Sequence, residues 1–469
     1  MKRLKFKAFT PFLILVTVAL IAMFIKPAAD YIPGAKDPQY NNADIAWVLV
    51  STALVFLMTP GLAFFYGGMV NRKNVISTMI KSVVAAGIVG ILWIVVGFSL
   101  SFGDSIGGMI GNPMTFLFFK GVKGHAAWPL ASTIPLTLFS LFQLMFAIIT
   151  PGLVVGAVAE RIRFTAYVLF IVLFSLLVYF PLAHWSWHPD GFLAKMGAFD
   201  FAGGTVVHIS AGCAALAGAM VLKPRKSYFD KKETHPANVP YILIGTGLLW
   251  FGWFGFNAGS AGGATSLAVN AFGTTTTSAS AAGLAWMFFD VLRGKKPSVI
   301  GFCVGAVVGL VAITPGAGYV GIPQSIIIGV VGSLISNIAV SIKQRSKLDD
   351  TLDVFPCHGI GGMTGMLLTG VFASKAVHGI PDGPQGAFYG NFPFLVTQFK
   401  AMAIVVLYSF GVSWLIFKFI NFILPLRVTQ EEEEEGLDAS QHNEKYLQGT
   451  LIVEKNGVYR EETIVEISQ

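Results

Sequence analysis

Eleven apolar segments, most of them about 20 residues or longer, restrict the fold of this 469-residue chain more than any other feature. A helix needs about 20 residues to span the roughly 30 Å hydrocarbon core of a bilayer. The segments cover residues 46–70, 75–102, 130–158, 164–184, 201–222, 239–258, 265–292, 299–314, 324–342, 355–373 and 394–425. We therefore predict an all-α integral membrane protein with eleven transmembrane helices.

The residue composition excludes a soluble protein. Hydrophobic residues make up 54% of the chain and charged residues 12%, whereas soluble chains carry about 25% charged residues. The net charge of +7 is not gathered on one binding face, so we expect a lipid bilayer and no nucleic acid as partner. Lysines and arginines concentrate in one set of alternate loops, and the other set holds Lys120, Lys123, Lys195 and Lys375. The positive-inside rule then predicts a multi-pass protein of the plasma (cell inner) membrane, with its N-terminus outside and its C-terminus in the cytoplasm.

The chain divides into three parts. Residues 1–29 have a basic start, an apolar run and a small-residue stretch ending at Ala29, which is typical of a signal peptide. A retained first helix is the alternative. Residues 44–426 form the transmembrane domain and 427–469 a cytoplasmic tail. The tail opens with a glutamate run, which is typical of a solvated segment, and two alternating stretches, 450–453 and 463–467, flank Asn456-Gly457 as in a small hairpin.

Cysteine usage indicates neither a disulfide framework nor a metal site. Cys213, Cys303 and Cys357 all lie in apolar segments, without metal-ligand spacing. Cys357 adjoins His358, but one cysteine beside one histidine is a weak metal signal. We expect no metal and no cofactor.

Two histidines in apolar segments are the main clue to function. His208 and His358 each follow an aspartate by eight residues, Asp200 and Asp350. An ionisable side chain in a bilayer costs free energy and normally faces a pore or a substrate site. The matched spacing predicts a 5+5 inverted repeat, with the two histidines meeting near the midplane of a central pore. The alternative is two unrelated packing histidines bonded to backbone carbonyls.

Several long motifs resemble the ammonium transporter (Amt/Mep/Rh) family, Amt branch. They are Pro60–Gly68, Ala157–Arg163, Asp200–Ser210, Gly252–Ser260 and Asp353–Gly359. The resemblance runs from about Asp44 to Tyr446. It implies a homotrimer of eleven-helix subunits, one pore in each, that transports ammonium or ammonia and accepts methylammonium as an analogue.

The resemblance assigns roles to individual residues. Phe146, Trp187 and Ser260 match the outer site that recruits NH4+, where aromatic faces attract the cation; Trp185 is a competitor of Trp187. Phe146 and Phe256 match two stacked phenyl rings that close the pore below that site. His208 and His358 match the twin pore histidines, and the remaining pore-wall residues follow by motif position: Leu62, Phe65, Leu249, Trp253 and Val354.

Two roles are open for Asp200. It could attract the cation directly, or its carboxylate could cap the following helix by accepting the N–H groups of Ala202 to Gly204. We favour the structural role. Asp350 is the counterpart that caps the tenth helix.

The resemblance also suggests a mechanism. A bare monovalent cation is costly to place in a low dielectric, and ammonium can release a proton whereas potassium cannot. We expect recruitment of NH4+, deprotonation near the outer gate and passage of NH3. Whether the proton crosses by a separate route stays open.

A sensor and an enzyme are the two alternative function classes. A sensor is suggested by relatives that combine a similar core with signalling, and an enzyme by the pairing of Ser260 with a membrane histidine. The sequence Asn257-Ala-Gly-Ser-Ala-Gly262 does not favour the latter, and we expect no enzyme. Residues 435–446 resemble the family's C-terminal region, which implies a PII-type regulatory partner; Asn443 stands where a glycine is usual.

Overall fold

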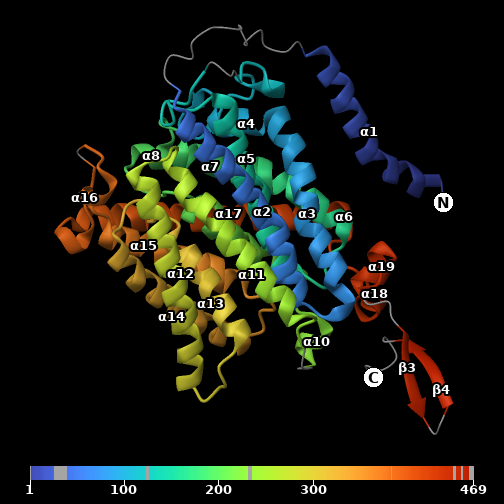
Figure 1. Cartoon of the computed structure of the whole chain (residues 1–469). Coiled ribbons are helices and arrows are strands. Elements are labelled where there is room, and N and C mark those ends of the chain that lie inside the picture. The colour runs from blue at the N-terminus through green and yellow to red at the C-terminus, as the bar shows by residue number, and fades with distance from the viewer. Residues whose placement is uncertain are drawn as a thin grey trace.

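The computed structural model describes residues 2–25, 40–122, 126–230, 235–381, 383–446, 450–455 and 458–463. They form a bundle of long helices (Figure 1). Eight helical stretches are long and apolar enough to cross a membrane: Asn42–Met69, Arg72–Phe102, Leu136–Val158, Phe164–Lys195, Gly204–Leu222, Val239–Ala261, Ile322–Gln344 and Phe392–Ile423. The predicted all-α membrane architecture is confirmed to that extent.

The long helices begin within four residues of the predicted limits, except α5, α9 and α15, which begin six to nine residues later. They are α2 (Asn42–Met69), α3 (Val75–Leu92), α5 (Leu136–Val158), α6 (Phe164–Phe174), α9 (Ser210–Leu222), α11 (Val239–Trp253), α12 (Ser266–Leu292), α13 (Val299–Ile313), α14 (Ile322–Gln344), α15 (Gly361–Phe372) and α17 (Phe392–Ile423). Three predicted spans fall on α12, on α13 and on α15 with the turn before it; length and hydropathy alone do not identify these as spanning.

Shorter elements extend or connect the long helices. Widened π-helical stretches are η2 (Trp93–Gly97), η4 (Ser175–Tyr179), η5 (Gly204–Ile209), η6 (Phe254–Ala258) and η8 (Phe355–Ile360). Short helices are η1 (Arg72–Asn74), α4 (Phe98–Phe102), η3 (Leu117–Phe119), α7 (Phe180–Trp187), α8 (Phe192–Lys195), α10 (Lys226–Phe229), η7 (Gly259–Ala261), α16 (Lys375–His378) and η9 (Ala387–Tyr389). A two-residue ladder joins β1 (Ser105–Ile106) and β2 (Ile110–Gly111).

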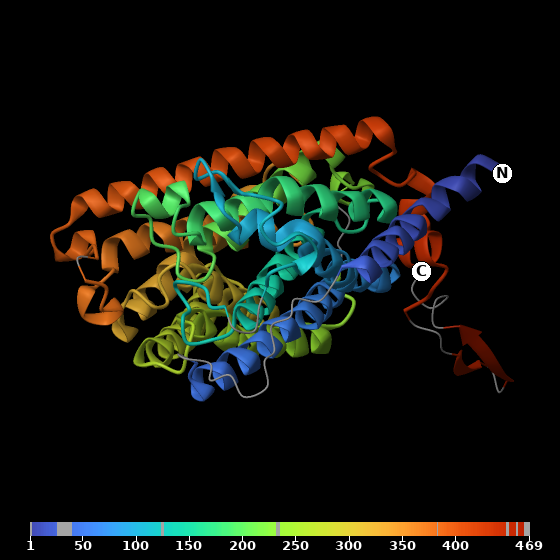
Figure 2. The ribbon, with the colours of Figure 1, turned by 90° about the horizontal axis from the view of Figure 1, so that it is seen from above.

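Asparagine side chains start three of the long helices. Asn41 accepts the Ala43 N–H at 2.8 Å before α2, Asn238 accepts the Tyr241 N–H at 3.0 Å before α11, and Asn391 accepts the Phe394 N–H at 3.3 Å before α17. Each bond satisfies a donor that the first helical turn leaves without an intrahelical partner. Figure 2 shows α17 lying along one edge of the bundle.

The two halves of the chain meet through glycines. At Gly212 in α9, an added Cβ would lie 2.2 Å from the Gly359 nitrogen in η8. At Gly245 in α11, it would lie 2.3 Å from the Phe65 nitrogen in α2. Small residues let helix backbones approach this closely. The segments that carry His208 and His358 are therefore in direct backbone contact.

The C-terminal segment packs on one end of the bundle, which we call the tail face. Its helices are α18 (Gln430–Glu435) and α19 (Leu437–His442). The Asp438 carboxylate accepts the Ile76 N–H at 3.1 Å and the Ser77 N–H at 2.7 Å, so it caps the first turn of α3. Asn443 has φ 55° and ψ 38°, a left-handed conformation that asparagine tolerates better than most residues. This explains how it replaces a glycine.

The glutamate run is not a purely solvated segment, contrary to our expectation. Glu432 lies 2.9 Å from Arg163, Glu433 2.6 Å from Arg427 and Glu434 2.6 Å from Lys226. The basic loops that set the predicted orientation therefore supply partners for the acidic run.

Both ends of the chain carry elements outside the bundle. Residues Lys2–Phe24 form α1, and the predicted cleavage point near Ala29 lies outside the described residues. After the tail, β3 (Thr450–Lys455) pairs antiparallel with β4 (Val458–Thr463). The predicted hairpin is present, but its second strand starts five residues earlier than expected; Asn456-Gly457 lies outside the described residues.

Candidate functional site: a histidine pair between two cavities

The two histidines belong to the widened π-helical turns. His208 lies in η5 and His358 in η8, and both are nearly inaccessible. Their Nδ1 atoms are 3.3 Å apart and their ring planes are inclined by 26°. Single π-helical turns inside α-helices occur frequently at functional sites. The structure thus brings together the two residues that the aspartate spacing singled out, 150 positions apart in the chain.

Each π-helical turn is preceded by its capping aspartate. The Asp200 carboxylate accepts N–H groups from Gly203 at 2.9 Å, Gly204 at 2.6 Å and Thr205 at 2.7 Å, and it accepts the Thr205 hydroxyl. The cap therefore begins one residue later than the predicted Ala202–Gly204. All near donors converge on this carboxylate, which supports its structural reading.

Asp350 makes the equivalent cap in the second half. Its two oxygens accept the Val354 N–H at 3.0 Å and the Phe355 N–H at 2.7 Å. Burial raises the pKa of the Asp350 carboxyl to about 6, although Lys343 acts in the opposite direction. The two aspartates thus occupy matching places ahead of matching turns.

A small cavity adjoins the histidine pair. Its volume is about 10 Å³, which is room for the centre of one water-sized molecule. Its lining is apolar apart from the histidines: Met58, Leu62, Phe65, Ile149, Leu153, Val207, His208, Leu249, Trp253, Phe256, Val307 and His358. All the predicted pore-wall residues line it except Val354. That side chain packs toward Gly156 instead, because its N–H is held by the Asp350 cap.

The hydrogen-bond partners of the histidines restrict their tautomers. With two Nδ1 atoms facing each other, one ring donates and the other accepts. Among the described residues the buried His208 Nε2 has no partner. Its ring lies against Trp253 at 5.3 Å and Phe256 at 5.8 Å between centroids. The His208 Nε2 atom can therefore form one hydrogen bond with a small solute in the cavity.

A second, wider cavity lies on the other side of Phe256, and we call it the vestibule. Its volume is about 240 Å³, and its lining includes Phe146, Trp187, Ser260 and Asp200. The Trp187 Nε1–H donates to the Asp200 carbonyl at 3.1 Å. The predicted outer-site residues therefore share one cavity.

Trp185 does not reach the vestibule. Its Nε1–H donates to the Met109 carbonyl at 2.6 Å, and its ring packs on Phe192 and Tyr408. Of the two tryptophans, Trp187 is the one that the geometry places at the predicted site.

Two phenyl rings separate the vestibule from the small cavity. Phe146 lines the vestibule and Phe256 lines the small cavity, and both are almost fully buried. Their centroids are 4.4 Å apart with an interplanar angle of 44°. The predicted pair is present, but the rings are tilted rather than stacked in parallel. A molecule passing from one cavity to the other has to displace at least one of them.

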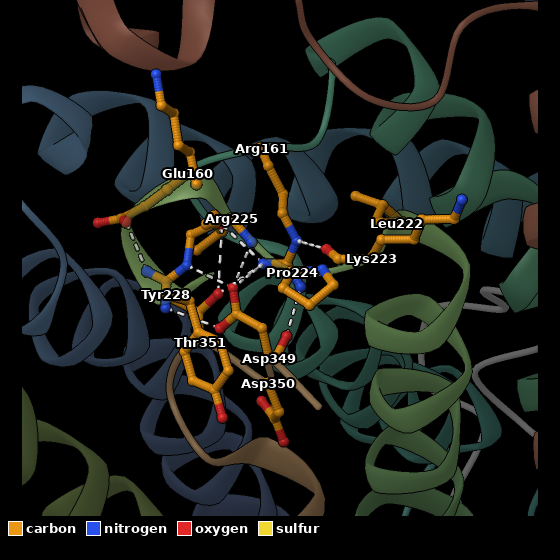
Figure 3. A network of polar contacts seen from close by, with 12 residues as sticks. Glu160, Arg161, Leu222, Lys223, Pro224, Arg225, Tyr228, Asp349, Asp350 and Thr351 are labelled. Carbon is orange, nitrogen blue, oxygen red and sulfur yellow. Dashed lines mark hydrogen bonds and ion pairs between the residues drawn. The ribbon is translucent and has the colours of Figure 1, made fainter. Parts of the chain in front are cut away.

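Buried ion pairs stabilise the tail face. Their residues lie in loops, and the sequence does not reveal that they are buried. Arg225 binds Asp349 through two bonds of 2.8 Å and Glu160 at 2.6 Å (Figure 3). Arg161 donates to the Lys223 carbonyl at 3.0 Å and to the Asp349 carbonyl at 2.5 Å. These residues come from three loops far apart in the chain, so no local pattern reveals the network.

Burial and pairing act against each other in this network. Burial lowers the pKa of the Arg161 guanidinium to about 10, although Asp349 opposes this effect. Burial alone would raise the pKa of the Asp349 carboxyl, but Arg161 and Arg225 more than offset it and hold that pKa below 3.8. The carboxylate is therefore charged at neutral pH and joins three loops.

A bundle of apolar helices that buries a pair of facing imidazoles beside an apolar cavity is typical of an integral membrane transport protein. The family model described as Ammonium Transporter Family matches residues 46–446. A putative ammonium transporter of Methanothermobacter thermautotrophicus is 46% identical over 407 residues, covering 86% of this chain and 98% of the relative. An ammonium transporter of Aquifex aeolicus is 45% identical over 413 residues, covering 88% and 95%.

Solved structures show the same fold. The crystal structure of Saccharomyces cerevisiae Mep2 matches with a TM-score of 0.79 and 33% identity, covering 84% of this chain and 89% of that one. A structure titled Sensor Amt Protein matches with a TM-score of 0.78 and 30% identity, covering 86% and 98%. The chain belongs to the ammonium transporter family, as its motifs predicted. Its function is that of an ammonium transporter rather than an enzyme.

Proposed function

We propose that this protein recruits NH4+ in the vestibule, that the ion releases one proton to vestibule water at the Phe146–Phe256 gate, and that NH3 passes His208 and His358. The observation that carries this proposal is the pair of facing imidazoles beside a cavity with room for one small molecule. Aromatic faces in the vestibule favour a cation, whereas the inner cavity is apolar and favours a neutral solute.

The energetics separate ammonium from potassium. Moving a bare monovalent ion from water into a low-dielectric interior costs on the order of 20 kcal/mol in the idealised case. Ammonium avoids most of this cost by leaving a proton behind, and NH3 both donates and accepts hydrogen bonds. The unpartnered His208 Nε2 gives it one partner inside the path. Potassium has no neutral form and stays outside.

The same proposal includes the topology and assembly. We infer eleven spans with a 5+5 inverted repeat, because α2 packs on α11 and η5 on η8, the matched elements of the two halves. Residues 1–29 are the signal peptide, 427–469 the cytoplasmic tail and the tail face the cytoplasmic side of the plasma membrane. We infer a homotrimer from family membership, and a PII-type regulatory protein as the partner of the tail face.

Uptake of methylammonium into liposomes tests the mechanism. His208→Ala or His358→Ala removes half of the pair, and we expect loss of discrimination against K+ or loss of uptake. His378→Ala is the matched control, because this histidine packs on Phe199, bonds the Pro384 carbonyl and lines neither cavity. Uptake by both pair variants with unchanged selectivity over K+ would refute this role.

A sensor is the second candidate, favoured by the match to the structure titled Sensor Amt Protein. Uptake by the purified protein separates the candidates, because a protein that only senses ammonium binds it without net flux.

A further inference from the structure

Gln143 is a vestibule residue to which neither the motifs nor the proposed mechanism assigns a role. It lies on α5, three residues before Phe146 and therefore on the same face of the helix. The side chain lines the vestibule together with Trp187 and Ser260. Its Oε1 atom is buried and has no hydrogen-bond partner within the described part of the chain.

An unpartnered buried carbonyl oxygen costs free energy of about 1–3 kcal/mol. In membrane proteins, polar groups without a hydrogen-bond partner normally face a solute pathway, where the solute is the partner. The amide oxygen and nitrogen exchange places by a half-turn about the last side-chain bond, so the oxygen reaches either side of the amide plane. In this conformation Oε1 is shielded from solvent, so Gln143 offers an acceptor to a solute in the cavity after that half-turn of the amide.

The Asp200 and Ser260 oxygens do not provide enough free hydrogen-bond acceptors for an ammonium ion. An ammonium ion has four tetrahedral N–H donors. The Asp200 carboxylate already accepts four close donors from Gly203 to Thr205. The Ser260 hydroxyl donates to the Phe256 carbonyl at 2.8 Å, which leaves its lone pairs as one acceptor site. The rings of Phe146 and Trp187 supply two faces, so the remaining donor needs one further oxygen. Besides the Gln143 amide, the lining holds the hydroxyls of Tyr319 and of Ser186, which already lies 3.4 Å from the Thr205 hydroxyl.

We propose that the Gln143 carbonyl oxygen accepts an N–H of the recruited ammonium ion and thereby sets the preference for ammonium over alkylated ammonium ions. This inference rests on the proposed recruitment in the vestibule. Each methyl group on the ion replaces one donor. A site with a directional partner for every donor rejects such an analogue more strongly than a site that leaves one donor without a partner.

Gln143→Leu removes the acceptor and keeps a similar volume. We expect the ammonium concentration that half-inhibits methylammonium uptake to rise about tenfold or more, because a hydrogen bond to a charged group contributes roughly one to two powers of ten in binding. We also expect the ammonium-to-methylammonium preference to shrink. Gln143→Glu keeps an acceptor and adds a charge, so its half-inhibiting concentration should equal or fall below the native value.

Two controls make the result decisive. Gln324→Leu applies the same chemical change in the first turn of α14, away from the vestibule lining, and should behave like the native protein. If Gln143→Leu does not fold, Gln143→Met removes the acceptor on a flexible side chain. Half-inhibition by ammonium within about twofold of native in a folded variant without the acceptor overturns the proposal.

Thermal stabilisation by ammonium chloride over potassium chloride measures binding without transport. If the native protein shows stabilisation but no flux, the proposed conduction fails while the Gln143 test stands on the stabilisation alone. Equal stabilisation of native protein and Gln143→Leu again overturns the role.

Discussion

Replacing Asp200 by asparagine tests whether this carboxylate holds the fold or attracts the cation. One oxygen, Oδ1, accepts the Gly203 and Gly204 N–H groups, and the other, Oδ2, accepts the Thr205 N–H and hydroxyl. Asparagine supplies one oxygen and one NH2 group. It therefore keeps at most the first pair, and its NH2 group faces two donors.

The expected loss follows from that count. A buried donor left without an acceptor costs about 1–3 kcal/mol, so Asp200→Asn should reduce the free energy of unfolding by about 2–6 kcal/mol. Asp200→Ala loses these four bonds, together with the longer one from the Val206 N–H at 3.4 Å, and about 4–12 kcal/mol, which is comparable to the whole stability of a typical domain. We expect the alanine variant to fold poorly.

Asp350→Asn is the matched comparison. Each Asp350 oxygen accepts one N–H, so asparagine loses one bond and about 1–3 kcal/mol. Thermal unfolding in detergent and methylammonium uptake should be measured on the same preparations. Uptake that falls in proportion to the folded fraction supports the structural role. An Asp200→Asn protein as stable as native but without uptake would refute it in favour of direct attraction.

Two further predictions concern the gate and the tail face. Phe256→Ala removes the ring between the vestibule and the small cavity, so we expect measurable K+ current across a bilayer where the native protein shows none; an unchanged current would mean that Phe146 closes the path alone. The pKa of Asp349 is held low by Arg161 and Arg225, so its stabilising effect is present above pH 3.8 and is lost as pH falls through the lower folded-state value. Thermal unfolding from neutral pH to about pH 3 should show this loss, and Asp349→Asn should flatten it; equal slopes for both proteins would contradict the assignment.

The helical membrane fold was predictable because each apolar segment specifies its own helix. Apolar runs of about 20 residues specify spanning helices without reference to any partner. The spacing from Asp200 to His208 and from Asp350 to His358 marked both capping aspartates and the two histidines that face each other. The motif match then located Trp187 and Phe146, which the structure places in one cavity.

The remaining features depend on contacts between distant segments. The π-helical turns at His208 and His358 were not predictable, because the hydrophobicity of an apolar run is the same whether a turn is α-helical or π-helical. Val354 lies outside the lining of the small cavity, with its side chain toward Gly156, so its role in the pore wall stays a prediction. The ion pairs of Arg225 join it to residues 65 and 124 positions away, so charge counting detected the residues but not their burial.

The size of the cavity beside the histidines has a consequence for cellular energetics. A space with room for the centre of one water-sized molecule cannot hold a continuous file of waters along which protons hop. If NH3 crosses as proposed, single neutral molecules pass this cavity and hydronium does not follow them by the same path. A membrane holding many copies of the protein would then keep the proton gradient that drives ATP synthesis.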